Sequence, residues 1–173
     1  NNVETSVICH ALINKEINKL VNGVNVYFCP INFSLFSFHF SITYIIRFII
    51  LVKTVDIVHI HCPNPVAFLS VLFSPFSFKY VLHWHSDVIK QKFLYKFFKV
   101  IENIVVNNAE IIIGSTNSHI VCSNQYKNFK SKYKVISYAI NFDFLNAKPK
   151  KPNSIPTHFF NKKFVFSLGR HVS

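Results

Sequence analysis

The sequence predicts an α/β protein built on a doubly wound parallel sheet, a sheet that helices cover on both faces. Two observations favour this class. Short apolar runs of strand length alternate with longer runs of helical spacing, as in repeated strand–helix–strand units. The strand-like runs are also apolar along their whole length, which is typical of strands buried on both faces. A chain of 173 residues suffices for one sizeable core.

Each expected strand is a short run rich in β-branched or aromatic residues. These runs occupy residues 3–11, 24–30, 56–61, 79–84, 110–114 and 134–140. Pro30 ends the second run, and Pro63 and Pro65 follow the third. Proline cannot donate a hydrogen bond to a strand ladder, so these residues mark the strand ends.

The segments between the strands favour helices. Helical runs are expected at residues 38–53, 66–73, 88–108 and 117–129. In the third run apolar residues recur every three or four positions, at Phe93, Phe97, Ile101, Ile104 and Val105. Thr116 or Asn117 is the expected N-cap of the fourth, because either side-chain oxygen can accept a hydrogen bond from a free backbone N–H group.

The predicted domain organisation is one domain and the beginning of another. Residues 1–145 form the parallel-sheet domain, with an incomplete N-terminus. Residues 146–162 are rich in Lys, Pro and Asn and lack periodicity, which predicts an interdomain linker. Residues 163–173 begin with the strand-like run KFVFSL, the expected first strand of a second domain. We therefore interpret the chain as a fragment.

The charge balance is strongly basic. Nineteen Lys and Arg against seven Asp and Glu give a net charge of +12, which favours anionic partners such as nucleic acid, anionic lipid or phosphorylated substrates. The alternative is AT-rich codon usage, since Phe, Ile, Asn, Lys and Tyr are all abundant. No RNA-binding aromatic signature or zinc-finger spacing is present, so nucleic acid is not expected as a partner.

Cysteine usage predicts a reducing, cytoplasmic location. Cys9, Cys29, Cys62 and Cys122 include no C-x-x-C pair, and three of them lie in or beside apolar strand-like runs. A free thiol there behaves as a small buried hydrophobe. No disulfide framework is expected.

One apolar stretch, residues 33–53, is long enough to resemble a membrane span. It contains His39, Arg47 and several serines, and a charge near the centre of a span costs about 2.5–3.5 kcal/mol. We favour a helix packed on the sheet. A helix lying on a membrane surface is the second alternative and a true span the third.

Three short motifs follow expected strands: HIHCPNP from His59, HWHSD from His83 and GSTN from Gly114. Ligands of open parallel sheets bind outside the carboxyl ends of the strands. The carboxyl ends of parallel strands meet at one edge of a sheet, so the three motifs predict one cleft.

The two His-x-His pairs raise the question of a metal site. His59 and His61 share one face of a strand, as do His83 and His85, because side chains alternate with period two. Asp87 is the only suitably placed acidic residue nearby, and no known ligand spacing is present. We therefore interpret His59 and His83 as packed core residues in mid-strand and expect no metal.

His85 differs because it ends its strand. Ser86 and Asp87 can start the next helix, whose free N–H groups would face an anion, with Lys90 one turn further on. Asp87 has an alternative role as the N-cap of that helix, and Lys90 as a solvated side chain. The chain has no Gly-x-Ser-x-Gly nucleophile elbow. Its three glycines form no phosphate-binding loop.

Five segments in order resemble the N-terminal domain of family-4 retaining glycosyltransferases, of the kind that build lipopolysaccharide, O-antigen and capsule. They are DIVHIHCPNP from Asp56, HWHSDVIKQK from His83, AEIIIGST from Ala109, KVISYAIN from Lys134 and FVFSLGR from Phe164. The resemblance covers most of the chain from Asp56 onward, and WHSDVIKQ is its most specific block.

The resemblance implies a GT-B arrangement, in which two Rossmann-like domains face each other across a cleft. The acceptor binds mainly to the first domain and the nucleotide-sugar donor mainly to the second. This chain would supply the Rossmann-like N-terminal domain and the first strand of the donor domain. Retention in this fold is described as front-face displacement, which needs no protein nucleophile, metal or cofactor.

The resemblance also implies roles for individual residues. His85 would be the active-site histidine that reaches the transferred sugar. The residues expected on the substrate side are Ser86, Asp87, Lys90 and Asn64. Arg170 would pair with the donor diphosphate, and an arginine fork suits the charge that develops on this leaving group.

Departures from the family pattern bear on activity. The glycine-rich acceptor loop is absent, and the usual Pro-x-Gly-x-Asp appears as Ser137-Tyr-Ala-Ile-Asn141. Alanine in place of glycine costs conformational freedom where φ is positive. The donor-binding residues expected after Arg170 are also absent, so we expect this chain alone to be inactive.

The predicted function of the parent protein is hexosyl transfer, with retention, from a nucleotide-sugar to a lipid-linked saccharide at the inner face of the cell membrane. Anionic lipid is an expected partner, because each basic residue near such a surface contributes about 1 kcal/mol. Two alternatives remain open. One is a non-enzymatic membrane-binding remnant of such an enzyme, and the other is a metal-dependent hydrolase that uses the His-x-His pairs.

Overall fold

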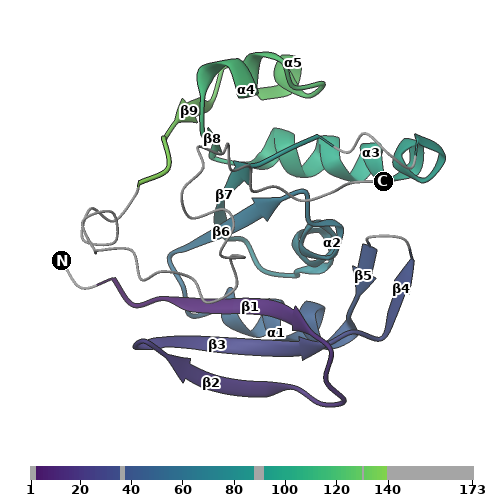
Figure 1. The fold of residues 1–173 in the computed structure, drawn as a ribbon, viewed down its shortest axis with the longest axis vertical. Helices are drawn as coiled ribbons and strands as arrows, with labels where there is room; N and C mark the ends of the chain where they lie inside the picture. The colour runs from purple at the N-terminus through teal and green to yellow at the C-terminus, as the bar shows by residue number, and fades with distance from the viewer. Residues whose placement is uncertain (1–2, 36–37, 88–91, 130, 140–173) are drawn as a thin grey trace, which may run out of the picture. The chain divides into compact units, whose positions relative to one another are not determined.

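The computed structural model describes residues 3–35, 38–87, 92–129 and 131–139, which form an α/β fold with a four-stranded parallel sheet flanked by helices (Figure 1). The α/β class predicted from the sequence is confirmed. The chain separates into two compact units, Asn1–Tyr138 and Ala139–Ser173, and every described helix and strand lies in the first. The predicted linker, the predicted strand at 163–168 and Arg170 lie outside the described residues.

The four-stranded sheet consists of β6 (Ile57–Cys62), β7 (Lys79–Trp84), β8 (Ile111–Gly114) and β9 (Tyr133–Val135), in that order. All three pairings are parallel. In the register, His61 lies opposite His83 and Trp84 lies opposite Gly114. Consecutive strands are therefore neighbours, and their carboxyl ends come together at one edge.

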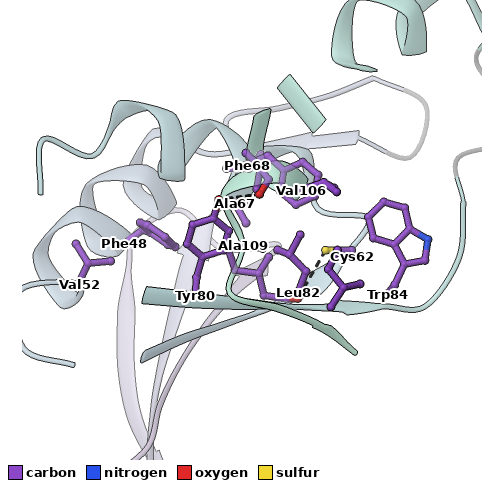
Figure 2. Close-up of a cluster of buried hydrophobic side chains, with 14 of the residues drawn as sticks. Phe48, Val52, Cys62, Ala67, Phe68, Tyr80, Leu82, Trp84, Val106 and Ala109 are labelled. Atoms are coloured by element: carbon purple, nitrogen blue, oxygen red, sulfur yellow. Dashed lines mark hydrogen bonds between the residues drawn. The ribbon is translucent and has the colours of Figure 1, made fainter. Parts of the chain in front are cut away.

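α2 (Pro65–Phe73) connects β6 to β7 and α3 (Lys92–Asn108) connects β7 to β8, and both helices contribute side chains to the core. Tyr80, Leu82 and Trp84 of β7 pack with α2 and α3 side chains in the buried cluster of Figure 2. The Tyr80 hydroxyl donates a hydrogen bond of 2.7 Å to the Val105 carbonyl oxygen of α3. The histidines of β6 and β7 alternate with these core residues and so occupy the other face of the sheet.

A second sheet precedes the first and contains a strand that the sequence analysis missed. Its order is β1 (Ser6–Ala11), β3 (Val24–Pro30) and β2 (Ile17–Val21). β1 and β3 pair in parallel, whereas β2 and β3 form an antiparallel hairpin. Asn22 and Gly23, with φ of 50° and 81°, form its turn. Both residue types tolerate positive φ, so Asn-Gly is a strong hairpin signal.

The helix expected at 38–53 begins later than predicted. A short hairpin of β4 (Phe33–Leu35) and β5 (Phe38–Phe40) comes first, and α1 (Ile42–Leu51) follows. Ser41 ends the hairpin region and caps the helix, because its hydroxyl accepts a hydrogen bond from the Tyr44 backbone N–H group at 3.1 Å.

α1 packs on β1 and β3, as the favoured alternative predicted (Figure 1). Tyr44 and Phe48 are its buried residues. Arg47 pairs with Glu16 through two hydrogen bonds, Nε to Oε1 at 2.5 Å and Nη2 to Oε2 at 3.0 Å. Its guanidinium also lies 4.6 Å from the centre of the Tyr27 ring. Among the described residues we find no helix with the length and apolar character of a membrane span.

The single helix predicted at 117–129 is wrong, because two short helices occupy this segment. They are α4 (Asn117–Val121) and α5 (Tyr126–Phe129). Thr116 is confirmed as the N-cap of α4, with its hydroxyl accepting from the His119 N–H group at 3.1 Å. Ser123 and Asn124, between the helices, donate hydrogen bonds to Asp87, which turns the chain out of the helix. The last strand is also shorter than the predicted 134–140.

The four cysteines are free thiols in this structure. Cys29 and Cys62 are buried, and Cys9 and Cys122 are progressively more exposed. Burial raises the pKa of Cys29 to about 12, and it raises the pKa of Cys62 still more strongly. Both buried thiols are therefore neutral core side chains.

Candidate functional site

The candidate site lies at the carboxyl ends of β6 and β7 and in the segment that follows β9. The His85 backbone N–H group donates to the Cys62 carbonyl oxygen at 3.1 Å, which extends the β6–β7 ladder by one residue. The Ile136 N–H group donates to the Gly114 carbonyl oxygen at 2.9 Å and likewise extends the β8–β9 pairing. His85 and Tyr138 are thus carried to the same edge by the parallel sheet.

His85 is the middle member of a hydrogen-bonded chain. Its Nε2 lies 2.7 Å from Nδ1 of His61, and its Nδ1 lies 2.8 Å from the Tyr138 hydroxyl. The rings of His61 and His85 are also stacked, with centroids 5.0 Å apart and planes at 4°. The chain joins three separate segments, so the position of His85 is fixed from both sides.

Four imidazole rings gather here, and we call His59, His61, His83 and His85 the histidine cluster. Adjacent rings are stacked, with centroids 4.3 Å apart for His83 and His85 and 4.9 Å apart for His59 and His61. His59 and His61 are exposed, so the prediction that His59 is a core residue is wrong, whereas His83 and His85 are half-buried. Both ring nitrogens of His83 are buried, and neither has a hydrogen-bond partner among the described residues.

The surroundings of the histidine cluster lower the pKa of several of its members. Burial, followed by repulsion from the three other imidazoles, lowers the pKa of His83 to about 4. Burial and then His61 and His119 lower the pKa of His85. The pKa of His59, whose ring is partly desolvated although the residue is exposed, is lowered by that desolvation and then by His61 and His85. These rings are neutral at pH 7, so each offers one hydrogen-bond donor and one lone pair.

Asp87 serves as an anchor for the loop between α4 and α5. Its Oδ1 accepts hydrogen bonds from the Trp84 indole at 2.8 Å and from the Ser123 hydroxyl at 2.6 Å. Its Oδ2 accepts from the Asn124 backbone N–H group at 2.5 Å. Because both carboxylate oxygens have protein partners, the structure supports a positioning role for Asp87.

The other predicted substrate residues are placed differently. Ser86 is exposed beside His85. Asn64 caps α2, since its Oδ1 accepts a hydrogen bond from the Ala67 N–H group at 3.1 Å. Lys90 and Arg170 lie outside the described residues, as does the start of the predicted helix that Asp87 would cap. The structure therefore brings together His85, Ser86 and Asp87, with Asn64 on the next loop.

Sequence reasoning did not identify three residues of this site: Tyr138, Ser123 and Asn124. Tyr138 belongs to the segment that the resemblance singled out, but its bond to His85 joins residues 53 positions apart. Ser123 and Asn124 lie in a segment predicted as helix. The sequence signal for them was weak, although Ser and Asn are favoured in turns.

A hollow of about 310 Å³ lies at the opposite, amino end of the sheet. It lies between α2, α3 and the start of β7, and its lining is Val71, Leu72, Phe76, Ser77, Phe78, Tyr80, Ile104, Val105 and Asn108. None of its lining residues titrates near neutral pH. We assign the candidate site to the histidine cluster because the ionisable groups gather there.

Comparison with known proteins gives two distant relatives. The chain is 26% identical over 108 residues to the O-antigen chain mannosyltransferase C of Escherichia coli, which covers 62% of this chain and 29% of that protein. It is 24% identical over 121 residues to the D-rhamnosyltransferase WbpZ of Pseudomonas aeruginosa, which covers 70% of this chain and 32% of that protein. The chain spans about a third of each relative's length. No family profile and no solved structure matches it.

Proposed function

We propose that this chain is the acceptor-side domain of a retaining glycosyltransferase of family 4 with the GT-B arrangement. It would transfer a hexose from a nucleotide-sugar to a lipid-linked saccharide. The observation that carries the proposal is the placement of His85 at the carboxyl edge of a parallel sheet, held between His61 and Tyr138. The similarity to two glycosyltransferases, one of them named for O-antigen, supports the same class.

His85 is suited to contact a sugar hydroxyl. Its ring is neutral near pH 7, and its Nδ1 is satisfied by the hydroxyl of Tyr138, a residue that is 62% exposed. An acceptor or donor hydroxyl can replace the phenol at this position without leaving the ring nitrogen unpaired. His61 keeps the ring orientation during that exchange, because it bonds the other nitrogen.

In the proposed transfer reaction the protein forms no covalent bond to the sugar. The bond between the anomeric carbon and the leaving phosphate oxygen breaks, and a bond to the acceptor oxygen forms on the same face. The acceptor proton passes to the leaving diphosphate. Arg170 is proposed to stabilise the charge on that group, and Lys90 and Ser86 to contact the acceptor.

We also propose that the protein docks peripherally on the inner face of the cell membrane, where a lipid-linked acceptor would be met. The net charge of +12 favours anionic lipid. The face of α1 opposite the core carries Ile42, Ile46 and Ile50, which are 54%, 54% and 45% exposed. Apolar side chains at four-residue intervals form one stripe on a helix, which suits partial insertion into a bilayer surface.

The test is nucleotide release by the complete protein that carries this chain, assayed with a panel of nucleotide-sugars and a membrane lipid extract. His85→Ala should lower lipid-dependent release by about 100-fold or more, as removal of one stabilising hydrogen-bond group does in other enzymes. His39→Ala, which changes an exposed histidine outside the cluster, should leave it unchanged.

Two results would contradict the proposal. Unchanged release by His85→Ala would remove this residue from the mechanism. No release with any donor by a folded protein would favour the membrane-binding remnant.

A further inference from the structure

The histidine cluster contains more ring nitrogens than the proposed transfer reaction uses. His59, His61 and His83 each present one nitrogen, and these three atoms all lie within 4.8 Å of one another. The parallel register produces this grouping, because His61 lies directly opposite His83 and His59 is two residues earlier on the same face. Three imidazoles from two adjacent strands thus converge on one point.

We propose that His59, His61 and His83 bind a divalent transition-metal ion of the Zn²⁺ type. This inference is independent of the proposed function, for which no metal is expected. Neutral imidazole is a ligand that Zn²⁺, Co²⁺, Ni²⁺ and Cu²⁺ prefer, and three histidines with an open fourth position is a known zinc coordination. Mg²⁺ and Ca²⁺ are not expected, because the three residues supply no oxygen ligand.

His83 provides a separate observation that points to a ligand. Both of its ring nitrogens are buried without a hydrogen-bond partner among the described residues. A buried polar atom of this kind costs about 1–3 kcal/mol unless something satisfies it. A metal ion bonded to one of these nitrogens would satisfy it.

The contacts of His61 orient it for metal binding. Its Nδ1 lies 2.7 Å from His85 Nε2, which leaves Nε2 of His61 for the ion. His85 in turn bonds Tyr138 at 2.8 Å. Metal-bound histidines usually donate their second N–H group to a neighbour in this way, which fixes the tautomer and ring orientation. His85 would therefore support the site without touching the ion.

The three rings must approach one another slightly when an ion binds. Zn–N bonds of about 2.0–2.1 Å in a tetrahedral site place the nitrogens roughly 3.3 Å apart. The present nitrogens lie within 4.8 Å. His59 and His61 are exposed, so rotation of these two side chains can close the gap while the strands stay in place.

The test is a metal titration of the chelator-treated chain. Wild type should bind one Co²⁺ per chain with the visible absorption of a tetrahedral nitrogen-ligated ion, and Zn²⁺ should displace it with micromolar affinity or better. His59→Gln and His61→Gln should each weaken Zn²⁺ binding by more than 100-fold. His85→Gln should weaken it by about 10–100-fold, as loss of a supporting partner does.

His39→Gln is the matched control, since His39 is exposed and lies outside the cluster. It should bind Zn²⁺ as wild type does. The proposal is overturned if wild type binds no stoichiometric ion, or if His59→Gln and His39→Gln bind equally well. If a variant fails to fold, the site is tested on the wild-type chain alone, by NMR. Zn²⁺ must then shift the imidazole NMR signals of His59, His61 and His83 and not that of His39, and the opposite pattern refutes the site.

Discussion

At the scale of single residues, the Asp87 carboxylate is a clear case for a stability test, because it accepts three hydrogen bonds. It accepts from the indole of Trp84, which is 1% exposed, and from Ser123 and Asn124 of the loop after α4. Hydrogen bonds to a charged group contribute about 1.5–3 kcal/mol. Asp87→Ala should therefore lower the free energy of unfolding by roughly 2 kcal/mol or more, measured by urea denaturation.

Two further variants distinguish the loss of the Asp87 hydrogen bonds from the loss of a negative charge. Asp56→Ala removes an exposed carboxylate and should change stability by less than about 0.5 kcal/mol. Ser123→Ala removes one of the three donors and should cost less than Asp87→Ala. Equal stability of Asp87→Ala and wild type would mean that Asp87 does not anchor the loop.

His10 allows a pH prediction away from the candidate site. Its ring stacks on Tyr44 at 4.8 Å, and burial followed by repulsion from His39 lowers its pKa. Below about pH 6.5 the unfolded chain therefore binds a proton that the folded chain resists. Stability should be constant above that pH and fall as the pH decreases toward the folded-state pKa, by less than about 1.4 kcal/mol per pH unit from this residue.

The variant His10→Phe should show the contribution of this ring, because phenylalanine keeps the stack on Tyr44 and cannot titrate. The stability lost between pH 7 and pH 5, from urea denaturation, should be smaller than in wild type. Val100→Phe, which changes an exposed residue that cannot titrate, is the control, and its loss should stay as in wild type. An identical loss in His10→Phe would show that His10 does not resist protonation.

The sequence allowed prediction of residues whose role depends on local chain geometry. His85 was expected at a strand end and Thr116 at a helix start, and both lie there. The partner of His85 was not predictable, because Tyr138 reaches it only through the pairing of β8 with β9. The hydrogen bonds of Asp87 to Ser123 and Asn124 were not predictable either, because they join residues far apart in the sequence.

At the scale of secondary structure elements, Gly114 sets the distance between β8 and α4. A Cβ atom at this position would lie 2.3 Å and 2.4 Å from the Cγ1 and Cδ1 atoms of Ile120, which is fully buried. Gly114→Ala should therefore destabilise the fold by about 1–3 kcal/mol, the usual cost of overpacking. Thermal unfolding measures this change.

A double-mutant cycle tests the cause. In an Ile120→Ala background the clash is absent, so Gly114→Ala should cost much less there. Gly23→Ala is the matched control, because Gly23 has no atom within 4 Å of its Cβ position but a φ of 81°. Its cost of about 1–2 kcal/mol from the left-handed backbone should be the same in both backgrounds. An unchanged cost of Gly114→Ala in the Ile120→Ala background would refute the steric explanation.

Element prediction failed where tertiary contacts or turn chemistry override an apolar pattern. The strand β2 contains Asn18 and Lys19, so its apolar signal is weak, and the Asn22-Gly23 turn was the better evidence. The run at 117–129 has helical spacing but is interrupted where Ser123 and Asn124 bond Asp87. The strand at 79–84 was predicted at its observed bounds.

At the scale of the whole chain, the alternation of strands and helices from β6 onward was predictable, whereas the sheet connectivity was not. Alternation of apolar runs defines the α/β class, since each strand needs a connecting helix to pair in parallel. The division of the strands between the β1–β3–β2 sheet and the β6–β9 sheet depends on hydrogen bonds between distant segments. No local pattern reports such bonds.

The net charge and the apolar stripe of α1 together predict how the chain meets a lipid surface. It should bind vesicles containing anionic phosphatidylglycerol, bind neutral vesicles weakly, and dissociate at high salt, because screening removes the attraction of the Lys and Arg side chains. Ile46→Glu should weaken binding about tenfold or more. Burying an exposed isoleucine side chain contributes about 1.5–3 kcal/mol of binding free energy. A loss of about 1.4 kcal/mol raises the dissociation constant tenfold.

The control for this experiment is Val100→Glu, which places the same new charge on an exposed apolar position of α3, 61% exposed against 54% for Ile46. The two variants have the same net charge, so a difference between them in vesicle co-sedimentation reports the surface that inserts. Equal weakening would show that net charge alone governs binding and that α1 does not enter the bilayer. Vesicle binding that changes with neither the salt concentration nor the anionic lipid content would refute docking of this chain on anionic lipid.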